Sequence, residues 1–224
     1  MRVLHQFIID GISILAYDEC ESQSAQWVAW ELQEDDYHLR EMSFAKGDIV
    51  VDIGAHIGLF SIYLAKRWPD ITIYAFEPFP TNFRNCMDNL RLNHVENVVL
   101  SPMAVANDNR LMSMTVDPQN SGGASAVIRV FEPFGVVNDI KSVALDEVFS
   151  LRSIERCRLL KIDCEGMEYE ILRGATVLNR VDYIAGEFHS SAYLQAQGLS
   201  PDRLREYCAR VFAADRIAIR FNTI

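Results

Sequence analysis

The chain is short of basic residues. Its 224 residues include 31 Asp and Glu against 21 Lys and Arg, a formal net charge of −10 at pH 7, and no run of Lys and Arg offsets this charge. Binding to a phosphate backbone depends on clustered cations that displace the counterions of the nucleic acid. We therefore expect no nucleic-acid partner.

Paired cysteines are also lacking. The five cysteines are scattered along the chain, no two of them form a C-x-x-C motif, and an odd number cannot complete a set of disulfides. This usage is typical of reduced thiols and predicts a cytoplasmic protein.

No apolar run is long enough to cross a bilayer. The N-terminal stretch MRVLHQFIIDGISILAY is interrupted by Asp10 and Gly11, and no small-residue cleavage site follows it. An Asp-Gly pair between two apolar runs instead predicts a β-hairpin. We expect no membrane partner.

Internal repeats and low-complexity linkers are absent too. Half of the residues are apolar, which suffices for one sizeable core. We therefore expect a single domain over residues 1–224. Within it, residues 1–46 are predicted to form the hairpin and a short helical cap, and residues 47–224 the core.

Strands and helices alternate from residue 48 onward. The predicted strands are 48–53, 71–78, NVVLSPMAV, 157–163, 181–189 and RIAIRF, and the predicted helices are 57–67, one from Pro80, one through MEYEILRG and one from Ser200-Pro201. On the helix from Pro80, we expect Phe83, Met87 and Leu90 to share one face. This alternation predicts an α/β fold in which a doubly wound, mostly parallel sheet carries helices on both faces.

Residues 107–142 interrupt the alternation. The short apolar stretches RLMSMTV and SAVIRVF flank the turn-rich DPQNSGGAS, which predicts an inserted β-excursion. Because Gly122 and Gly123 lower the cost of unusual backbone angles, we expect NSGGAS to be a mobile loop beside the substrate entrance.

The stretch VVDIGAHIGLFS predicts a strand, a tight turn and a helix. Such a turn lies at the carboxyl edge of the sheet and is expected to offer free backbone N–H groups. Gly54 and Gly58 follow the pattern D-x-G-x-x-x-G, which lacks the middle glycine of the dinucleotide fingerprint. The spacing therefore favours a cofactor without a pyrophosphate over NAD, and S-adenosylmethionine (SAM) is the commonest such ligand.

Further cofactor contacts are predicted along the same edge. Glu77 follows the second strand, where a doubly wound fold places an acid that accepts both ribose hydroxyls, and Pro78 is next to it. His56 is expected to form a wall beside the cofactor without transferring protons. Ala104 and Val105 follow the third strand, where an adenine ring would lie flat. Helix capping by Glu77 and core packing by Ala104 and Val105 stay open as alternatives.

Acidic residues gather where the fourth and fifth strands end. Asp163 and Glu165 follow the strand of LLKID, and Glu187 and His189 point to the same side if GEFH is extended. Carboxylates stabilise a sulfonium, and a positioned base removes the acceptor proton. On chemistry alone His189 is the best-matched base. Asp163 or Glu165 would serve if desolvated. The same groups could instead hold Mg²⁺, although the sequence does not require it and we assign no metal.

The segments VVDIGAHIGLFSIYLAK, AFEPFPTNFRNCMDNLRLN and LLKIDCEGMEYEILRGA resemble the FkbM-type SAM-dependent methyltransferases. The resemblance runs from about Gly47 to His189. It implies a class I Rossmann-like fold, SAM as the cofactor and methylation of a hydroxyl on a small molecule, a natural product or a sugar. It also implies cofactor roles for Asp52, Gly54, Gly58 and Glu77, and active-site roles for Asp163 and Glu165.

Two other functions stay open. The chain could be a binding or scaffolding module that keeps the cofactor pocket without turnover, or a nicotinamide oxidoreductase, which the missing glycine disfavours. Residues 20–45 and 107–142 are expected to form the acceptor pocket, and neither carries a motif that identifies the acceptor or the oligomeric state.

Overall fold

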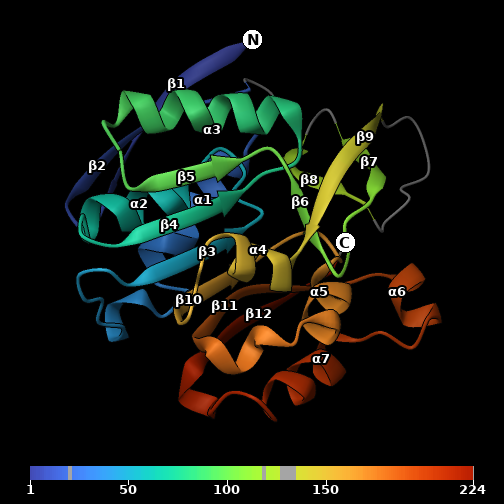
Figure 1. Cartoon of the computed structure of the whole chain (residues 1–224). Helices are drawn as coiled ribbons and strands as arrows, with labels where there is room; N and C mark the ends of the chain where they lie inside the picture. The colour runs from blue at the N-terminus through green and yellow to red at the C-terminus, as the bar shows by residue number, and fades with distance from the viewer. Residues whose placement is uncertain (20–21, 118–119, 127–134, 224) are drawn as a thin grey trace.

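A computed structural model describes the chain except for residues 20–21, 118–119, 127–134 and 224 (Figure 1). The described strands form a two-stranded hairpin, a six-stranded sheet and a four-stranded sheet. The six-stranded sheet has the order β12-β11-β10-β3-β4-β5, and all of its neighbouring strands are parallel. Its members are β3 (Ile49–Ile53), β4 (Thr72–Phe76), β5 (Val98–Ser101), β10 (Cys157–Ile162), β11 (Val181–Ser190) and β12 (Ile217–Thr223).

This sheet has the doubly wound order predicted from the sequence. Numbered by their place in the core, its strands run 3-2-1-4-5-6, so the winding reverses between β3 and β10. In open α/β sheets, ligands bind outside the carboxyl ends of the strands beside this reversal. The glycine turn follows β3 and the acidic segment follows β10, so the fold places both at the same point.

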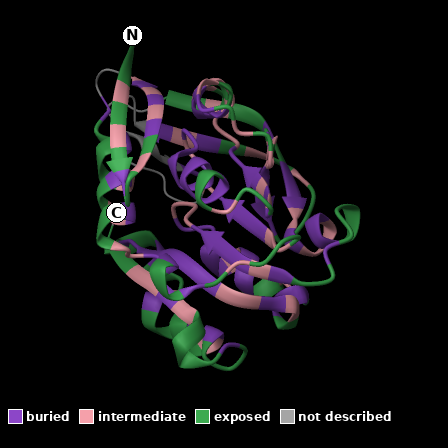
Figure 2. Ribbon diagram, turned by 90° about the vertical axis from the view of Figure 1, so that its left-hand side faces the viewer, coloured by how far each residue is buried: buried purple, intermediate pink, exposed green. Residues whose placement is uncertain are grey.

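Helices cover both faces of the sheet, as predicted. One core combines the hairpin with α1 (Ser24–Glu34), α2 (Leu59–Arg67) and α3 (Pro80–Leu92), and the other is built on α4 (Leu145–Leu151), α5 (Glu168–Gly174), α6 (Ala192–Ala196) and α7 (Pro201–Cys208). Alternate strand residues enter opposite cores: Val50 and Leu159 lie in the first, Val51 and Leu160 in the second. Figure 2 shows that the strands at the centre of the molecule are largely buried.

The N-terminal hairpin forms as predicted. β1 (Arg2–Ile9) and β2 (Ile12–Glu19) pair antiparallel, and Asp10 and Gly11 both have positive φ, as a type I′ turn requires. Within the cap, α1 is followed by the 3₁₀ turn η1 (Leu39–Glu41). The expectation of one or two short helices before the core is therefore confirmed.

The buried face of α3 differs from the prediction. Leu90 lies in the core, but Phe83 and Met87 are only half-buried. The face turned toward β2 instead carries asparagines: Asn89 and Asn93 accept the backbone N–H groups of Tyr17 and Leu15 at 2.7 and 3.0 Å, and both also donate to carbonyls of this strand. Their amides satisfy backbone groups of β2 that a third strand would otherwise pair.

The excursion forms its own sheet with the order β6-β9-β7-β8. Its strands are β6 (Ala104–Ala106), β7 (Leu111–Asp117), β8 (Asn120–Ser125) and β9 (Gly135–Ala144). The prediction of an inserted β-excursion is confirmed for the described residues, whereas most of the predicted apolar stretch SAVIRVF lies outside them. The prediction of a loop at NSGGAS is wrong, because this segment is β8 and pairs with β7. Pairing with a neighbouring strand outweighs the turn preference of its glycines.

Two predictions on chain chemistry concern described residues. Four of the five cysteines lie in the described part of the chain, and each is a free thiol: Cys86, Cys157, Cys164 and Cys208. Across the same residues, no helix is both long enough and apolar enough to cross a membrane.

Candidate active site

The turn between β3 and α2 is possible only with glycine at two positions. Gly54 has a φ of +80°, and a Cβ added there would lie 1.8 Å from the backbone oxygen of Asp163. Gly58 has a φ of +90° and forms the N-cap of α2, where a Cβ would lie 2.7 Å from Sγ of Cys86. The first glycine thus lets β3 approach the acidic segment, and the second lets α2 approach α3.

The backbone N–H groups of four residues within the turn are paired inside the protein. Gly54 and Ala55 both donate to the carbonyl of Phe76 at 3.0 Å, and Gly58 donates to the carbonyl of Ala55 at 2.8 Å. The N–H of His56 donates to the Glu77 carboxylate at 2.8 Å. These four donors are therefore not available to a ligand.

Glu77 lies at the carboxyl end of β4 and is 5% exposed. One carboxylate oxygen accepts the N–H of His56, and the other accepts the N–H of Phe79 at 2.9 Å, at the N-cap of α3. Burial raises the pKa of Glu77 to about 7, although both N–H donors act in the opposite direction. Glu77 therefore holds the turn and the residue before α3 in place, and each oxygen keeps a lone pair for a ligand.

These residues open on one cavity of about 390 Å³, within the range of small-molecule sites. The cavity joins the glycine turn to the acidic segment, with the cap at its side. Most of the predicted site residues line it: Gly54, His56, Glu77, Pro78, Ala104, Val105, Asp163, Glu165 and Glu187. From the two regions expected to hold the acceptor, the lining residues are Ser24, Trp27, Val28, Glu31, Tyr37, Met114 and Ala126.

Asp52 lies behind the turn, not at the cavity. It is fully buried, accepts the hydroxyl of Ser61 at 2.7 Å and lies 3.5 Å from Nζ of Lys161. Lys161 also donates to the carbonyl of Gly54 at 2.7 Å. We conclude that Asp52 supports the turn through these two partners, a less direct role than the predicted cofactor contact.

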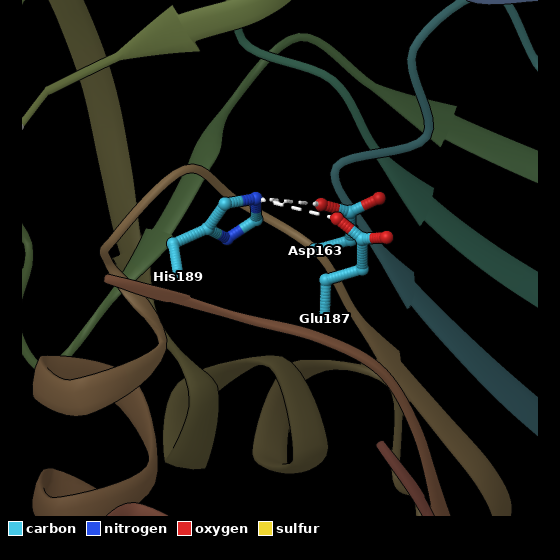
Figure 3. A group of neighbouring side chains, drawn as sticks. All are labelled: Asp163, Glu187 and His189. Atoms are coloured by element: carbon cyan, nitrogen blue, oxygen red, sulfur yellow. Dashed lines mark ion pairs between the residues drawn. The ribbon is translucent and has the colours of Figure 1, made fainter. Parts of the chain in front are cut away.

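The acidic residues meet as expected at the ends of β10 and β11. Three carboxylates surround Nε2 of one imidazole: those of Asp163, Glu165 and Glu187 lie 3.8, 3.6 and 3.5 Å from His189. Figure 3 shows two of them, Asp163 and Glu187, side by side and facing the ring. The other ring nitrogen, Nδ1, lies 2.8 Å from Oε1 of Glu168.

His189 is not placed as a general base for a ligand in the cavity. Its side chain is fully buried, and His189 is not among the described residues that line the cavity. Burial would lower its pKa, but Glu168, Glu165 and Asp163 together raise it to about 10. At neutral pH, the imidazole of the metal-free protein is therefore protonated and cannot accept a proton. The sequence had favoured His189 as the base.

Glu165 and Glu187 reach the cavity where His189 does not. Burial raises the pKa of Glu165 to about 8, against the opposing effect of His189, and it also raises the pKa of Glu187. Glu165 has a φ of +54°, and its carbonyl accepts the hydroxyl of Ser125 at 2.7 Å. A positive φ at a residue other than glycine is strained and is often found at functional sites.

Three charged site residues were missed from the sequence. Lys161 is 3% exposed and lies 3.6 Å from Asp163; burial would lower its pKa, but Asp52, Asp163 and Glu31 raise it. Glu168 is fully buried beneath His189, and Arg220 from β12 lies 3.5 Å from Glu187. A lysine inside the apolar strand LLKI was the available signal, because an unpaired charge is rarely buried.

The comparisons with known proteins agree with this geometry. A Methyltransferase FkbM domain matches residues 52–212. Methyltransferase 1 of Beauveria bassiana is 28% identical over 149 residues, 58% of this chain and 59% of that protein. Methyltransferase sdnD of Sordaria araneosa is 28% identical over 189 residues, 71% of this chain and 72% of that protein. The 31-O-demethyl-FK506 methyltransferase FkbM of Streptomyces tacrolimicus is 27% identical over 198 residues, 74% of this chain and 75% of that protein.

The domain match confirms the resemblance carried by the motifs: the chain belongs to the FkbM methyltransferase family, with SAM as its cofactor.

Proposed function

We propose that the protein transfers the methyl group of SAM to a hydroxyl group of a small molecule. One observation carries the proposal: a single cavity joins the glycine turn and Glu77 to three carboxylates. A cofactor at the first end and an acceptor at the second would share one enclosed space. Methyl transfer is an in-line displacement, so holding the two reactants in this way supplies most of the catalysis.

The cofactor is proposed to lie along the carboxyl ends of β3 and β4. The ribose hydroxyls would donate to Glu77, and the adenine would lie against Pro78, Ala104 and Val105. His56 forms a wall without proton transfer, since burial lowers its pKa to about 4. The sulfonium would then point toward the carboxylates, whose negative charge stabilises it.

The acceptor is proposed to enter between the cap and the acidic residues. Trp27 lines the cavity with 61% of its surface exposed, and Glu31 and Tyr37 lie deeper in the cap. One relative is named for the 31-O position of its substrate, and Hexuronic acid methyltransferase AglP of Haloferax volcanii, 24% identical over 144 residues, for a sugar acid. These names favour a small hydroxylated acceptor. The net charge disfavours a nucleic acid, and we propose a cytoplasmic location.

Glu165 is proposed as the base that takes the acceptor proton. It lines the cavity, and its backbone is held in a strained conformation. Burial raises its pKa to about 8, so the fraction of Glu165 that is ionised and able to accept a proton grows as the pH rises toward and through about 8. His189 lies behind it. Asp163 and Glu187 are proposed to orient the acceptor.

The test is turnover with labelled SAM against a panel of hydroxylated metabolites, with S-adenosylhomocysteine and the methylated product measured together. We expect coupled formation of both with at least one acceptor. Tight SAM binding without transfer to any acceptor would favour the binding module instead. Thermal stabilisation by NAD and not by SAM would favour the oxidoreductase.

A further inference from the structure

Asp163, Glu187 and His189 form a compact group at the acidic end of the cavity. One ligand atom from each lies within 4.8 Å of both others, and Figure 3 shows the two carboxylates converging on the ring nitrogen. Glu165 also contacts His189 but does not belong to this group. Two carboxylates and one imidazole are therefore arranged around a single point.

The distances around this point are too long for hydrogen bonds. Nε2 of His189 lies 3.5 Å from Glu187 and 3.8 Å from Asp163, beyond the usual N–H···O range. Nε2 has no hydrogen-bond partner within the described part of the chain, and the side chain is 0% exposed. Two ligand atoms each about 2.1 Å from a shared cation lie roughly 3–4 Å apart. The observed gaps match that spacing.

The far side of the imidazole is fixed by a second carboxylate. Nδ1 lies 2.8 Å from Oε1 of Glu168, and this oxygen also accepts the N–H groups of Cys164 and Gly166 at 3.0 and 3.2 Å. A proton on Nδ1 leaves the lone pair of Nε2 directed at Asp163 and Glu187. The carboxylate–histidine arrangement is the usual support behind a metal-binding histidine.

In each carboxylate, one oxygen faces the side chain of a neighbouring Lys or Arg, and the other oxygen faces His189. Oδ2 of Asp163 faces Lys161 at 3.6 Å, while Oδ1 faces His189. Oε1 of Glu187 faces Arg220 at 3.5 Å, while Oε2 faces His189. Oε2 also accepts a hydrogen bond from Nδ2 of Asn222 at 2.9 Å. The fixed cations thus leave one oxygen of each carboxylate turned toward Nε2.

We propose that Asp163, Glu187 and His189 bind a divalent cation of the Mg²⁺ and Mn²⁺ class. Oxygen ligands with one imidazole suit these ions, whereas Ca²⁺ takes six to eight oxygens and structural Zn²⁺ favours thiolate and histidine sets. Asp163 and Glu187 line the cavity, so water or an acceptor oxygen completes the coordination. The role in catalysis rests on the proposed methyl transfer: the cation binds the acceptor hydroxyl and lowers its pKa for Glu165. Cation binding itself does not depend on that function.

The experiment measures Mn²⁺ binding directly. Protein freed of metal with EDTA and dialysed is titrated with Mn²⁺, and free Mn²⁺ is followed by electron paramagnetic resonance. We expect one Mn²⁺ per chain, displaced by excess Mg²⁺. The isosteric variants Asp163→Asn and Glu187→Gln should weaken binding about 10-fold or more, and Glu168→Gln, behind the histidine, about 10–100-fold.

Glu170→Gln is the matched control, because it removes a carboxylate that pairs with Arg110 and lies outside both the cavity lining and the group. It should leave the Mn²⁺ affinity unchanged. Thermal unfolding of each metal-free variant establishes that it is folded. No bound Mn²⁺, or equal binding by the parent protein and Glu187→Gln, would overturn the site. Mn²⁺ binding without turnover counts against the methyl-transfer proposal alone, and turnover without Mn²⁺ binding counts against the site alone.

Discussion

The two ends of the cavity begin alike and are completed differently. Both lie where a parallel strand ends, β3 at one and β10 with β11 at the other. At the glycine turn, the N–H groups of residues 54, 55, 56 and 58 all have acceptors within the protein. At the acidic end, among the described residues, Nε2 of His189 and Oε2 of Glu168 have no hydrogen-bond partner.

This difference matches the chemistry proposed for each end. A turn whose donors are already paired is a rigid wall for a ligand that brings hydroxyls and an aromatic ring. Burial raises the pKa values of Glu165 and Glu187, and repulsion from the neighbouring carboxylates raises them further. A cationic ligand relieves that repulsion, so we expect changes at the two ends to have separable consequences.

The largest effect is expected from Glu165→Gln. The amide keeps the volume of the side chain but cannot take a proton, so kcat should fall roughly 10²–10⁴-fold. SAM affinity should fall far less than kcat, because the proposed ribose and adenine contacts lie at the other end of the cavity. Glu170→Gln is the control, since Glu170 pairs with Arg110 outside the cavity lining. Calorimetry with SAM and initial rates measure the two quantities, and an unchanged rate would remove Glu165 as the base.

Gly54→Ala should damage the cofactor end next most strongly. The new Cβ would meet the backbone oxygen of Asp163 at 1.8 Å, and alanine is strained at a φ of +80°. Strain and overpacking together predict a loss of roughly 2–5 kcal/mol in the free energy of unfolding, with loss of SAM binding.

Gly47→Ala separates these two causes. Gly47 has a similar φ of +87°, but nothing lies within 4 Å of a Cβ added there. It should lose only the strain component, about 1–3 kcal/mol. Denaturant unfolding of both variants measures the difference, and equal losses would show that contact with the acidic segment does not matter.

The cofactor end was more predictable from the sequence than the acidic end. Gly54, Gly58 and Glu77 belong to one strand-turn-helix-strand unit, so their spacing alone indicated their geometry. His189 was expected at the cavity because period two places it on the same side as Glu187. The depth of burial along β11 decides which of these two side chains reaches the ligand. The alternation of residues along a strand does not reveal that depth.

Two other errors have the same origin in tertiary contacts. Asn89 and Asn93 are buried because β2 offers unpaired backbone groups, which no helical pattern of apolar residues reveals. The strand at NSGGAS exists because β7 supplies a partner. NVVLSPMAV, predicted as one strand, forms β5 in the six-stranded sheet and β6 in the four-stranded sheet, because β9 pairs with its second half. The other helices and strands of the core lie close to their predicted positions because local periodicity and the sheet agree there.

Glu77 makes SAM binding depend on pH. Burial raises its pKa to about 7 in the cofactor-free protein, and the ribose hydroxyls need the ionised form as an acceptor. SAM affinity should therefore rise as the pH increases through about 7 and then level off. Because the folded pKa lies above the ordinary value of 4.5, the stabilisation from protonated Glu77 is complete below pH 4.5 and is lost as the pH rises from there to about 7.

Glu77→Gln tests this assignment. The variant keeps one carbonyl acceptor but removes the charge, so SAM binding should weaken by about 1.5–3 kcal/mol at pH 8. The affinity of the variant for SAM should no longer change between about pH 6 and about pH 8, two values on either side of the Glu77 pKa of about 7. Calorimetry at both pH values provides the measurement. A variant that retains the pH dependence would assign it to another group.

The smallest effect on the cofactor should come from Asn89→Ala, which reaches the turn through one hydrogen bond. Nδ2 of Asn89 donates to the carbonyl of Ile57 at 2.9 Å and to that of Tyr17 at 3.1 Å, and the side chain is 0% exposed. Alanine leaves the N–H of Tyr17 and both carbonyls without this partner, which predicts a loss of about 1–3 kcal/mol in the free energy of unfolding. SAM binding should weaken less than in Glu77→Gln, and Mn²⁺ binding should not change.

Asn93→Ala is the control, because it removes the equivalent contacts to Leu15 but none to the turn. It should cost similar stability and leave SAM affinity intact. Equal effects of the two variants on SAM affinity would show that the hairpin, and not the hydrogen bond to Ile57, supports the cofactor end.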